Sequence, residues 1–181
     1  MACTSPFVLA SILSVAIASP VAAQATPPGT TVDPARSPDA AFVAKAADLV
    51  SVDTELATLA AARASAASVK ALATRVLAAR KVIARDLASM AGTRQMPAAP
   101  PQPSPRPAAA PVSALRATAP GDFDAAFLAA LVANGEAAVA LFDTESRDGR
   151  DDEIKEWAAR QLPALREHLA AIRTLRPRPG S

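Results

Sequence analysis

Cysteine, histidine and aromatic residues are nearly absent from this chain of 181 residues. It has one cysteine, one histidine, one tryptophan, five phenylalanines and no tyrosine. Cys3 lies in a segment that we expect to be removed, so the mature chain needs no disulfide and has no thiol chemistry. Hydrophobic residues still make up 51% of the chain, and many are alanine, which favours closely packed helices over strands.

Charge of one sign is also lacking. The 19 basic and 17 acidic residues leave a net charge of +2, and the basic residues are scattered. Without a basic patch or tyrosine we expect no nucleic-acid binding. No Ser-His-Asp set, P-loop or dinucleotide fingerprint is present, and we therefore expect a protein that is not an enzyme.

The first 25 residues resemble a secretory signal peptide. An apolar stretch from Phe7 to Ala18 is followed by small-residue sites that predict cleavage after Ala23 or Ala25. This stretch is too short to span a bilayer, and no later segment looks apolar for long enough. No lysine or arginine precedes it, so a weak signal or a misplaced start codon is the alternative. Export predicts a periplasmic or secreted protein, with a Pro-rich tether over residues 26–37.

Residues 39–90 and 124–175 repeat one pattern at a constant shift of 85 positions. The sequence Asp-Ala-Ala-Phe at 39–42 recurs at 124–127, and apolar residues stay in register, as with Val43 over Leu128 and Met90 over Leu175. Apolar spacing of three to four residues predicts helices in both copies. The sequence thus predicts two helical hairpins, over residues 38–92 and 121–176, and a short tail at 177–181.

The ends of these helices carry local signals. The first helix should begin at residues 37–39 and end near Ala64, with Ser65 or Ser68 capping the second helix and Gly92 stopping it. Residues 121–124 should start the third helix, and residues 148–151 should end it and cap the fourth. Pro163 should kink the fourth helix. Trp157 and the phenylalanines after the signal lie on apolar stripes and are expected in the core.

Residues 93–120 form a Pro- and Ala-rich crossover. The part from Met96 to Pro111 should be extended, because proline breaks helices. In a polyproline conformation it reaches roughly 45 to 50 Å, against about 37 Å for a 25-residue helix. We therefore expect the second hairpin to begin at the same end as the first. This organisation predicts an all-α, ferritin-like four-helix bundle.

Few side chains could bind a metal. Dinuclear bundles use a Glu on two helices and a Glu-x-x-His pair on the others, whereas here Leu165 stands three residues before the sole histidine. Candidate ligands are His168, Glu136, Glu55 and Asp53, with Glu167 beside the histidine. A structural, partly buried or surface His168 is the competing interpretation.

An acidic series surrounds the turn between the third and fourth helices. Its spacing lacks the glycine-centred loop of an EF-hand, so we interpret it as a solvated turn whose charges suit a helix start. Its members are Asp143, Glu145, Asp148, Asp151, Asp152, Glu153 and Glu156.

Several segments together resemble the bacterial family called domain of unknown function 4142. They include residues 41–43, 53–60, 69–73, 123–128 and 140–142, and most specifically the Leu-Pro-x-Leu-x-x-His-Leu element at 162–169. The resemblance covers about residues 38–176 and implies a ferritin-like fold and export. Members of that family usually carry Asp-His where this chain has Ala79-Arg80, and a histidine where it has Gly135. Among the family's histidines only His168 is matched.

Two functional hypotheses follow. The first is an exported, non-catalytic bundle with no cofactor, which has an envelope or stress-related interaction role through its surface and Pro-rich segment and an envelope protein as partner. The alternative is a bundle that binds iron, manganese or zinc through His168, Glu136, Glu55 and Asp53.

Overall fold

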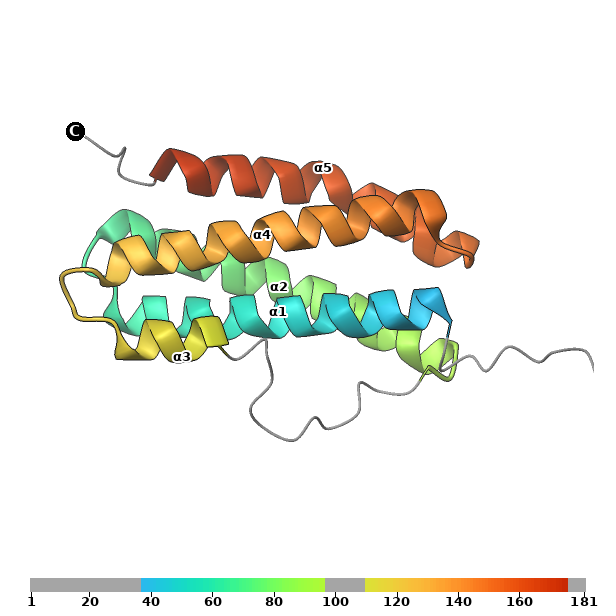
Figure 1. Cartoon of the computed structure of the whole chain (residues 1–181), viewed down its shortest axis with the longest axis horizontal. Coiled ribbons are helices and arrows are strands. Elements are labelled where there is room, and N and C mark those ends of the chain that lie inside the picture. The colour runs from blue at the N-terminus through green and yellow to red at the C-terminus, as the bar shows by residue number, and fades with distance from the viewer. Residues whose placement is uncertain (1–36, 97–109, 176–181) are drawn as a thin grey trace, which may run out of the picture. The chain divides into compact units, whose positions relative to one another are not determined.

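The computed structural model describes residues 37–96 and 110–175, and over these residues the chain is all-α with five helices and no strand. The helices are α1 (Pro38–Arg63), α2 (Ala67–Thr93), α3 (Ala110–Ala117), α4 (Phe123–Asp148) and α5 (Asp152–Leu175) (Figure 1). The predicted all-α class is confirmed. The predicted signal peptide (1–25), the tether up to residue 36, residues 97–109 of the crossover and the tail (177–181) lie outside the described residues.

The helix bounds follow the shift of 85 positions found in the sequence. Both ends of α1 map onto both ends of α4, and the first residue of α2 maps onto the first residue of α5. The residues that end α1 and α4 have nearly the same backbone angles, with φ −58° and ψ 142° at Ala64 and φ −56° and ψ 145° at Gly149. The two copies therefore share the length of their first helix and their turn geometry, whereas α2 has 27 residues and α5 has 24.

Each copy is an antiparallel helix pair, and the two pairs meet through α1 and α4 (Figure 1). The α1–α2 turn lies beside the start of α4, because Asp124 accepts hydrogen bonds from the backbone of Ser65 and Ala66. The second pair therefore begins at the end where α1 finishes. Our expectation that both pairs begin at the same end was wrong: α2 has already returned to the start of α1, so a crossover running the length of a helix leads to the opposite end.

Helix α3 is an element that the sequence analysis missed. Ala110 and Pro111, expected to be extended, form its first turn. Proline is compatible with the first turn of a helix, where its missing N–H has no intrahelical acceptor. Val112 and Leu115 of α3 are buried. The helix packs against α1 and α4.

The apolar core is divided into two clusters along the helices. One contains Phe123 and Phe127. The other contains Phe42, Phe142 and Trp157, whose ring centroids lie 5.0 to 6.3 Å apart. Such tilted and edge-on ring pairs add to the free energy gained by burial. The predicted core positions of these aromatic residues are confirmed.

Helix ends depend on long-range contacts as well as local ones. Ser37 caps α1 through its hydroxyl, 3.0 Å from the amide of Ala40, as the sequence indicated. The N-cap position of α2 is Ala66, so the prediction of Ser65 or Ser68 was wrong. The two carboxylate oxygens of Asp124 accept hydrogen bonds from the backbone amides of the turn that precedes α2, at 3.1 Å from Ser65 and 2.8 Å from Ala66, and no side chain caps the first turn of α2 itself. At the other signals, α2 ends one residue after Gly92, and α5 continues through Pro163.

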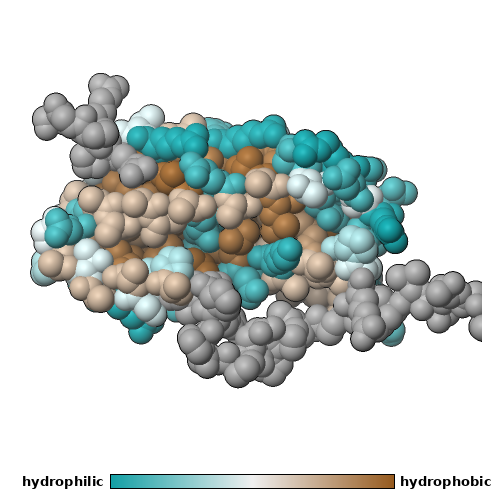
Figure 2. Space-filling model, viewed as in Figure 1, coloured by the Kyte–Doolittle hydropathy of each residue, from teal (hydrophilic) through white to brown (hydrophobic). Residues whose placement is uncertain are grey.

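Helix α4 is more apolar than the sequence analysis allowed. Alone among the described helices, it is long and apolar enough to cross a membrane by length and composition. The statement that no later segment is apolar for long enough was therefore too strict. On the face seen in Figure 2, brown and tan surface lies over α4, whereas hydrophilic side chains follow α5. Within the domain α4 packs against α1, α3 and α5.

Candidate functional site

A buried ion pair lies at the centre of the helices. Asp53 on α1 and Arg80 on α2 lie 2.7 Å apart, between Oδ2 and Nε, and their side chains are only 3% and 6% exposed. Burying two charges costs solvation free energy that their attraction recovers only with good geometry and further hydrogen bonds. The pair therefore requires other polar partners, and α4 provides one.

Asn134 on α4 completes this network. Its Nδ2 donates to Oδ1 of Asp53 at 2.7 Å and to the backbone carbonyl of Leu49 at 2.9 Å. Leu49 and Asn134 are equivalent under the 85-residue shift, so this contact joins the two copies where they meet. Asp53 is bound on both oxygens, and the negative charge of its carboxylate is balanced by the guanidinium of Arg80.

His168 on α5 also belongs to the polar centre, so each of the four long helices contributes a side chain to it. Its Nε2 is buried and has no hydrogen-bond partner within the part of the chain that the structure describes. Burial lowers the pKa of the imidazole, and the positive charge of Arg80 lowers it further, while Asp53 acts in the opposite direction. The imidazole is accordingly neutral at pH 7, and the network has one polar group with unused hydrogen-bonding capacity.

The predicted metal ligands do not gather around this centre. Asp53 is bound to Arg80 and Asn134, whereas Glu55 and Glu136 are about half exposed and lie beside Arg116, at 3.8 Å, and Arg173, at 2.7 Å. Glu167 is exposed on α5. In residues 37–96 and 110–175 no three His, Cys, Asp or Glu side chains lie close enough together to hold a metal ion. Of the four predicted ligands, only Asp53 and His168 belong to the polar centre.

The sequence analysis noticed Arg80 only as a departure from a family pattern and did not single out Asn134. A usable signal was present, because Arg80 lies at helical spacing between the buried Val76 and Ile83, and a charge on an apolar stripe needs a partner. Gly135 also has a packing reason: a Cβ there would lie 3.2 Å from the side chain of Leu169. A histidine at position 135 would require Leu169 to move.

A groove lies beside the polar centre, between α2 and α5. Its volume is about 440 Å³. Arg80 and His168 line it together with residues that are mostly apolar: Ala79, Val82, Ile83, Ala164, Leu165 and Ala171, with Gln161 and Glu167 as further polar side chains. The direct contact between α2 and α5 is much less extensive than that within either helix pair.

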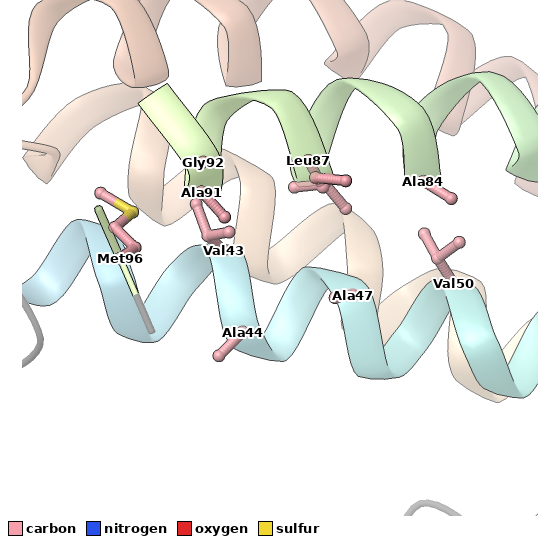
Figure 3. A pocket seen from close by; sticks show the side chains of 10 residues that line it. Val43, Ala44, Ala47, Val50, Ala84, Leu87, Ala91, Gly92 and Met96 are labelled. Atoms are coloured by element: carbon pink, nitrogen blue, oxygen red, sulfur yellow. The ribbon is translucent and has the colours of Figure 1, made fainter. Parts of the chain in front are cut away.

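A second hollow, of about 380 Å³, lies between α1 and α2. Figure 3 shows Met96 at one end of it and Val50 and Ala84 at the other, with apolar side chains along both helices. Small residues explain the empty volume, since Ala47 occupies the place that Val132 has in the second copy. This hollow has no charged lining residue.

A second buried carboxyl group lies at the α4–α5 end. Glu145 is 5% exposed, and its Oε1 has no hydrogen-bond partner among the described residues. Burial raises its pKa to about 7, and the neighbouring carboxylate of Asp39 contributes to the rise. The interpretation of Glu145 as part of a solvated turn was therefore wrong. Its side chain points from α4 into the interior of the domain, one helical turn before Gly149.

Asp39 has the opposite electrostatic behaviour. Burial opposes its ionisation, but the backbone amides of Arg150 and Asp151 donate to its Oδ1 at 2.8 and 3.2 Å, and its pKa is lowered overall. Asp151 in turn caps α5 by accepting from the amides of Glu153 and Ile154, which confirms the predicted cap. Arg94 binds Asp151 at 2.5 Å and lowers its pKa.

The comparison with protein families confirms the family resemblance found in the sequence. The model of a family described as a domain of unknown function, DUF4142, matches residues 22–175. The chain belongs to this family. No curated protein and no solved structure matches it.

Proposed function

We propose that this DUF4142 protein is an exported, non-catalytic binding protein of the cell envelope, with an interaction or stress-related role. The observation that supports this best is the internal neutralisation of its polar centre. Arg80 occupies the position next to Asp53 from which a ligand would otherwise approach, and both oxygens of Asp53 are bound. A centre of this kind fixes the relative positions of helices, and its carboxylate is not free to act as a base or nucleophile.

We further propose that the four long helices form a ferritin-like four-helix bundle. The support is the shift of 85 residues, which relates both the helix bounds and the capping contacts of the two antiparallel pairs. In bundles of this kind chemistry depends on side chains that face inward from all four helices. Here Asp53, Arg80, Asn134 and His168 meet that description, with an arginine in place of one metal ligand.

Export is tested by fractionating cells that produce the full chain and sequencing the N-terminus of the mature protein. We expect a periplasmic or secreted protein that begins at Gln24 or Thr26, after cleavage at Ala23 or Ala25. An uncleaved protein in the cytoplasmic fraction would contradict the proposal.

Metal binding is the alternative, and one observation favours it. Nε2 of His168 is buried without a partner near Asp53, and neutral imidazole nitrogen is a common ligand for zinc and iron. Metal analysis of protein purified without a histidine tag separates the two ideas. We expect no stoichiometric iron, manganese or zinc; a stoichiometric metal that is lost in His168→Ala would establish the alternative.

A further inference from the structure

The groove between α2 and α5 differs from an ordinary surface depression in its symmetry. Four pairs of its lining residues are related by the 85-residue shift, so the groove lies where the second helices of the two copies face one another. The pairs are Ala79 with Ala164, Arg80 with Leu165, Val82 with Glu167, and Ile83 with His168. At three of these pairs the two copies differ in polarity, and the groove has an apolar and a polar part on each side.

Arg80 is the cationic group of this groove, and Glu167 is the acidic one. Its Nε is bonded to Asp53, and no hydrogen bond joins its two terminal nitrogens to an acceptor among the described residues. A guanidinium with free terminal nitrogens in a largely apolar surrounding favours an anion, because charge-assisted hydrogen bonds are stronger where water is scarce.

His168 lies beside Arg80 in the same lining. Its buried Nε2 has no partner in the described chain, and buried polar atoms normally have one. A small reorientation of the imidazole would let it donate to the same anion, since a neutral ring carries one N–H group.

The rest of the lining favours an apolar group next to that anion. Val82 is 50% exposed and is the one large hydrophobic side chain with such exposure among the described residues. Ile83 and Leu165 continue this apolar surface, and the alanines on both helices leave room above it. A volume of about 440 Å³ lies within the range of roughly 300 to 1,000 Å³ that is common for small-molecule sites.

We propose that the α2–α5 groove binds a small amphiphilic carboxylate, with its anionic head at Arg80 and His168 and its apolar chain along Val82 and Ile83. Glu167 in the lining disfavours a ligand with a second negative charge. This inference goes beyond the proposed envelope role. It does not depend on export, because all residues that form the site lie outside the predicted signal peptide.

The single histidine permits a direct test. In the full chain without a histidine tag, His168 gives the only imidazole signals in a proton NMR spectrum. Titration with hexanoate is expected to shift these signals in a saturable manner, because the carboxylate binds next to the imidazole. Hexylamine, which has the same chain length and the opposite charge, is expected to cause no saturable shift.

A matched pair of variants locates the site. Ala164 lines the groove, whereas Ala170 is exposed on the same helix outside it. Ala164→Glu is expected to weaken hexanoate binding at least tenfold by charge repulsion and crowding, and Ala170→Glu by less than twofold, with helix content checked by circular dichroism. The proposal is overturned by the absence of a saturable shift, by equal responses to hexanoate and hexylamine, or by equal losses in the two variants.

Discussion

The two ends of the helical domain use the same capping contact but have different residues beneath it. At one end Asp124 accepts hydrogen bonds from the amides of Ser65 and Ala66; at the other Asp39 accepts them from Arg150 and Asp151. All three pairs of positions are related by the shift of 85. One turn before each helix end, however, the first copy has the buried Ala60 and the second copy the buried Glu145.

The middle of the domain differs between the copies in the same way. Asp53 and Arg80 of the first copy correspond to Ala138 and Leu165 of the second, and His168 of the second corresponds to Ile83 of the first. All these positions are buried except His168, which is half-buried. The comparison shows that backbone geometry and caps belong to the repeat, whereas each interior polar group belongs to one copy only. Replacing a residue of one copy by its counterpart in the other can therefore separate the contribution of the repeated helix framework from that of an interior polar group.

The largest effect is expected at the central ion pair. Asp53→Ala, which copies Ala138, leaves Arg80 buried without its counter-charge and should lower the free energy of unfolding by about 3–5 kcal/mol. The double variant Asp53→Ala/Arg80→Leu copies the second helix pair at both positions. It should recover to within about 1 kcal/mol of the natural protein, because a hydrophobic pair avoids the cost of burying charges.

Urea unfolding followed by the fluorescence of Trp157, the sole tryptophan, measures both variants. Glu55→Ala provides the control on the same helix: its ion pair with Arg116 is exposed and 3.8 Å long, and its loss should cost less than about 1 kcal/mol. If the double variant is as unstable as Asp53→Ala, the effect comes from lost packing and not from the unpaired charge.

The next effect concerns Glu145 and depends on pH. Its pKa is about 7 in the folded protein, against an ordinary value of 4.5, so the folded state holds the proton more tightly than the unfolded chain. The stability contributed by the protonated carboxyl is fully present below pH 4.5 and is lost as the pH rises through 7. Asp39, Asp151 and Lys155 are the charged neighbours that influence this group.

Glu145→Gln keeps the shape of the protonated acid and cannot ionise. We expect it to remove this loss, so that near pH 8 the variant is more stable than the natural protein by on the order of 2 kcal/mol, allowing for solvent screening at the end of the domain. Thermal unfolding at pH 5 and pH 8 measures the difference. Glu136→Gln, on the exposed side of α4, should give equal small changes at both pH values; a similar pH dependence in the two variants would refute the assignment to Glu145.

The repeat made much of this fold predictable from the sequence. Apolar spacing in two registered copies indicates four long helices, and local signals at Ser37 and Asp151 give correct helix starts. These features depend on residues within one or two turns of each other. The contacts that sequence reasoning missed join residues far apart in the chain, such as Asp124 with Ser65 and Asp53 with Arg80. A carboxylate in a first turn suits the dipole of its own helix, and nothing local reveals that it also binds the turn before another helix.

The candidate site was predictable only in part for the same reason. His168 and Asp53 were identified by residue type, and both belong to the polar centre. Glu55 and Glu136 were chosen by the same criterion, yet both point to the surface beside arginines. Asp53 and Glu55 lie two positions apart, which is about 200° around a helix, so they cannot face the same side. The spacing from Leu49 and to Leu56 indicates that Asp53 faces inward and Glu55 outward, and choosing ligands by residue type alone overlooked this. The burial of Glu145 was missed because charged residues surround it in the sequence on both sides.

The smallest effect tests whether the hollow between α1 and α2 is a defect of packing in the first copy. Ala47→Val introduces the residue that the second copy has at Val132, and burial of two more carbon atoms should outweigh the lower helix propensity of valine. We expect a gain of about 0.5 kcal/mol in urea unfolding. Ala61→Val, at an exposed position of the same helix, has only the propensity cost and should lose about 0.5 kcal/mol. Equal losses in the two variants would mean that the neighbours of Ala47 cannot accommodate a larger side chain, and that the first copy has adjusted its helix packing to alanine.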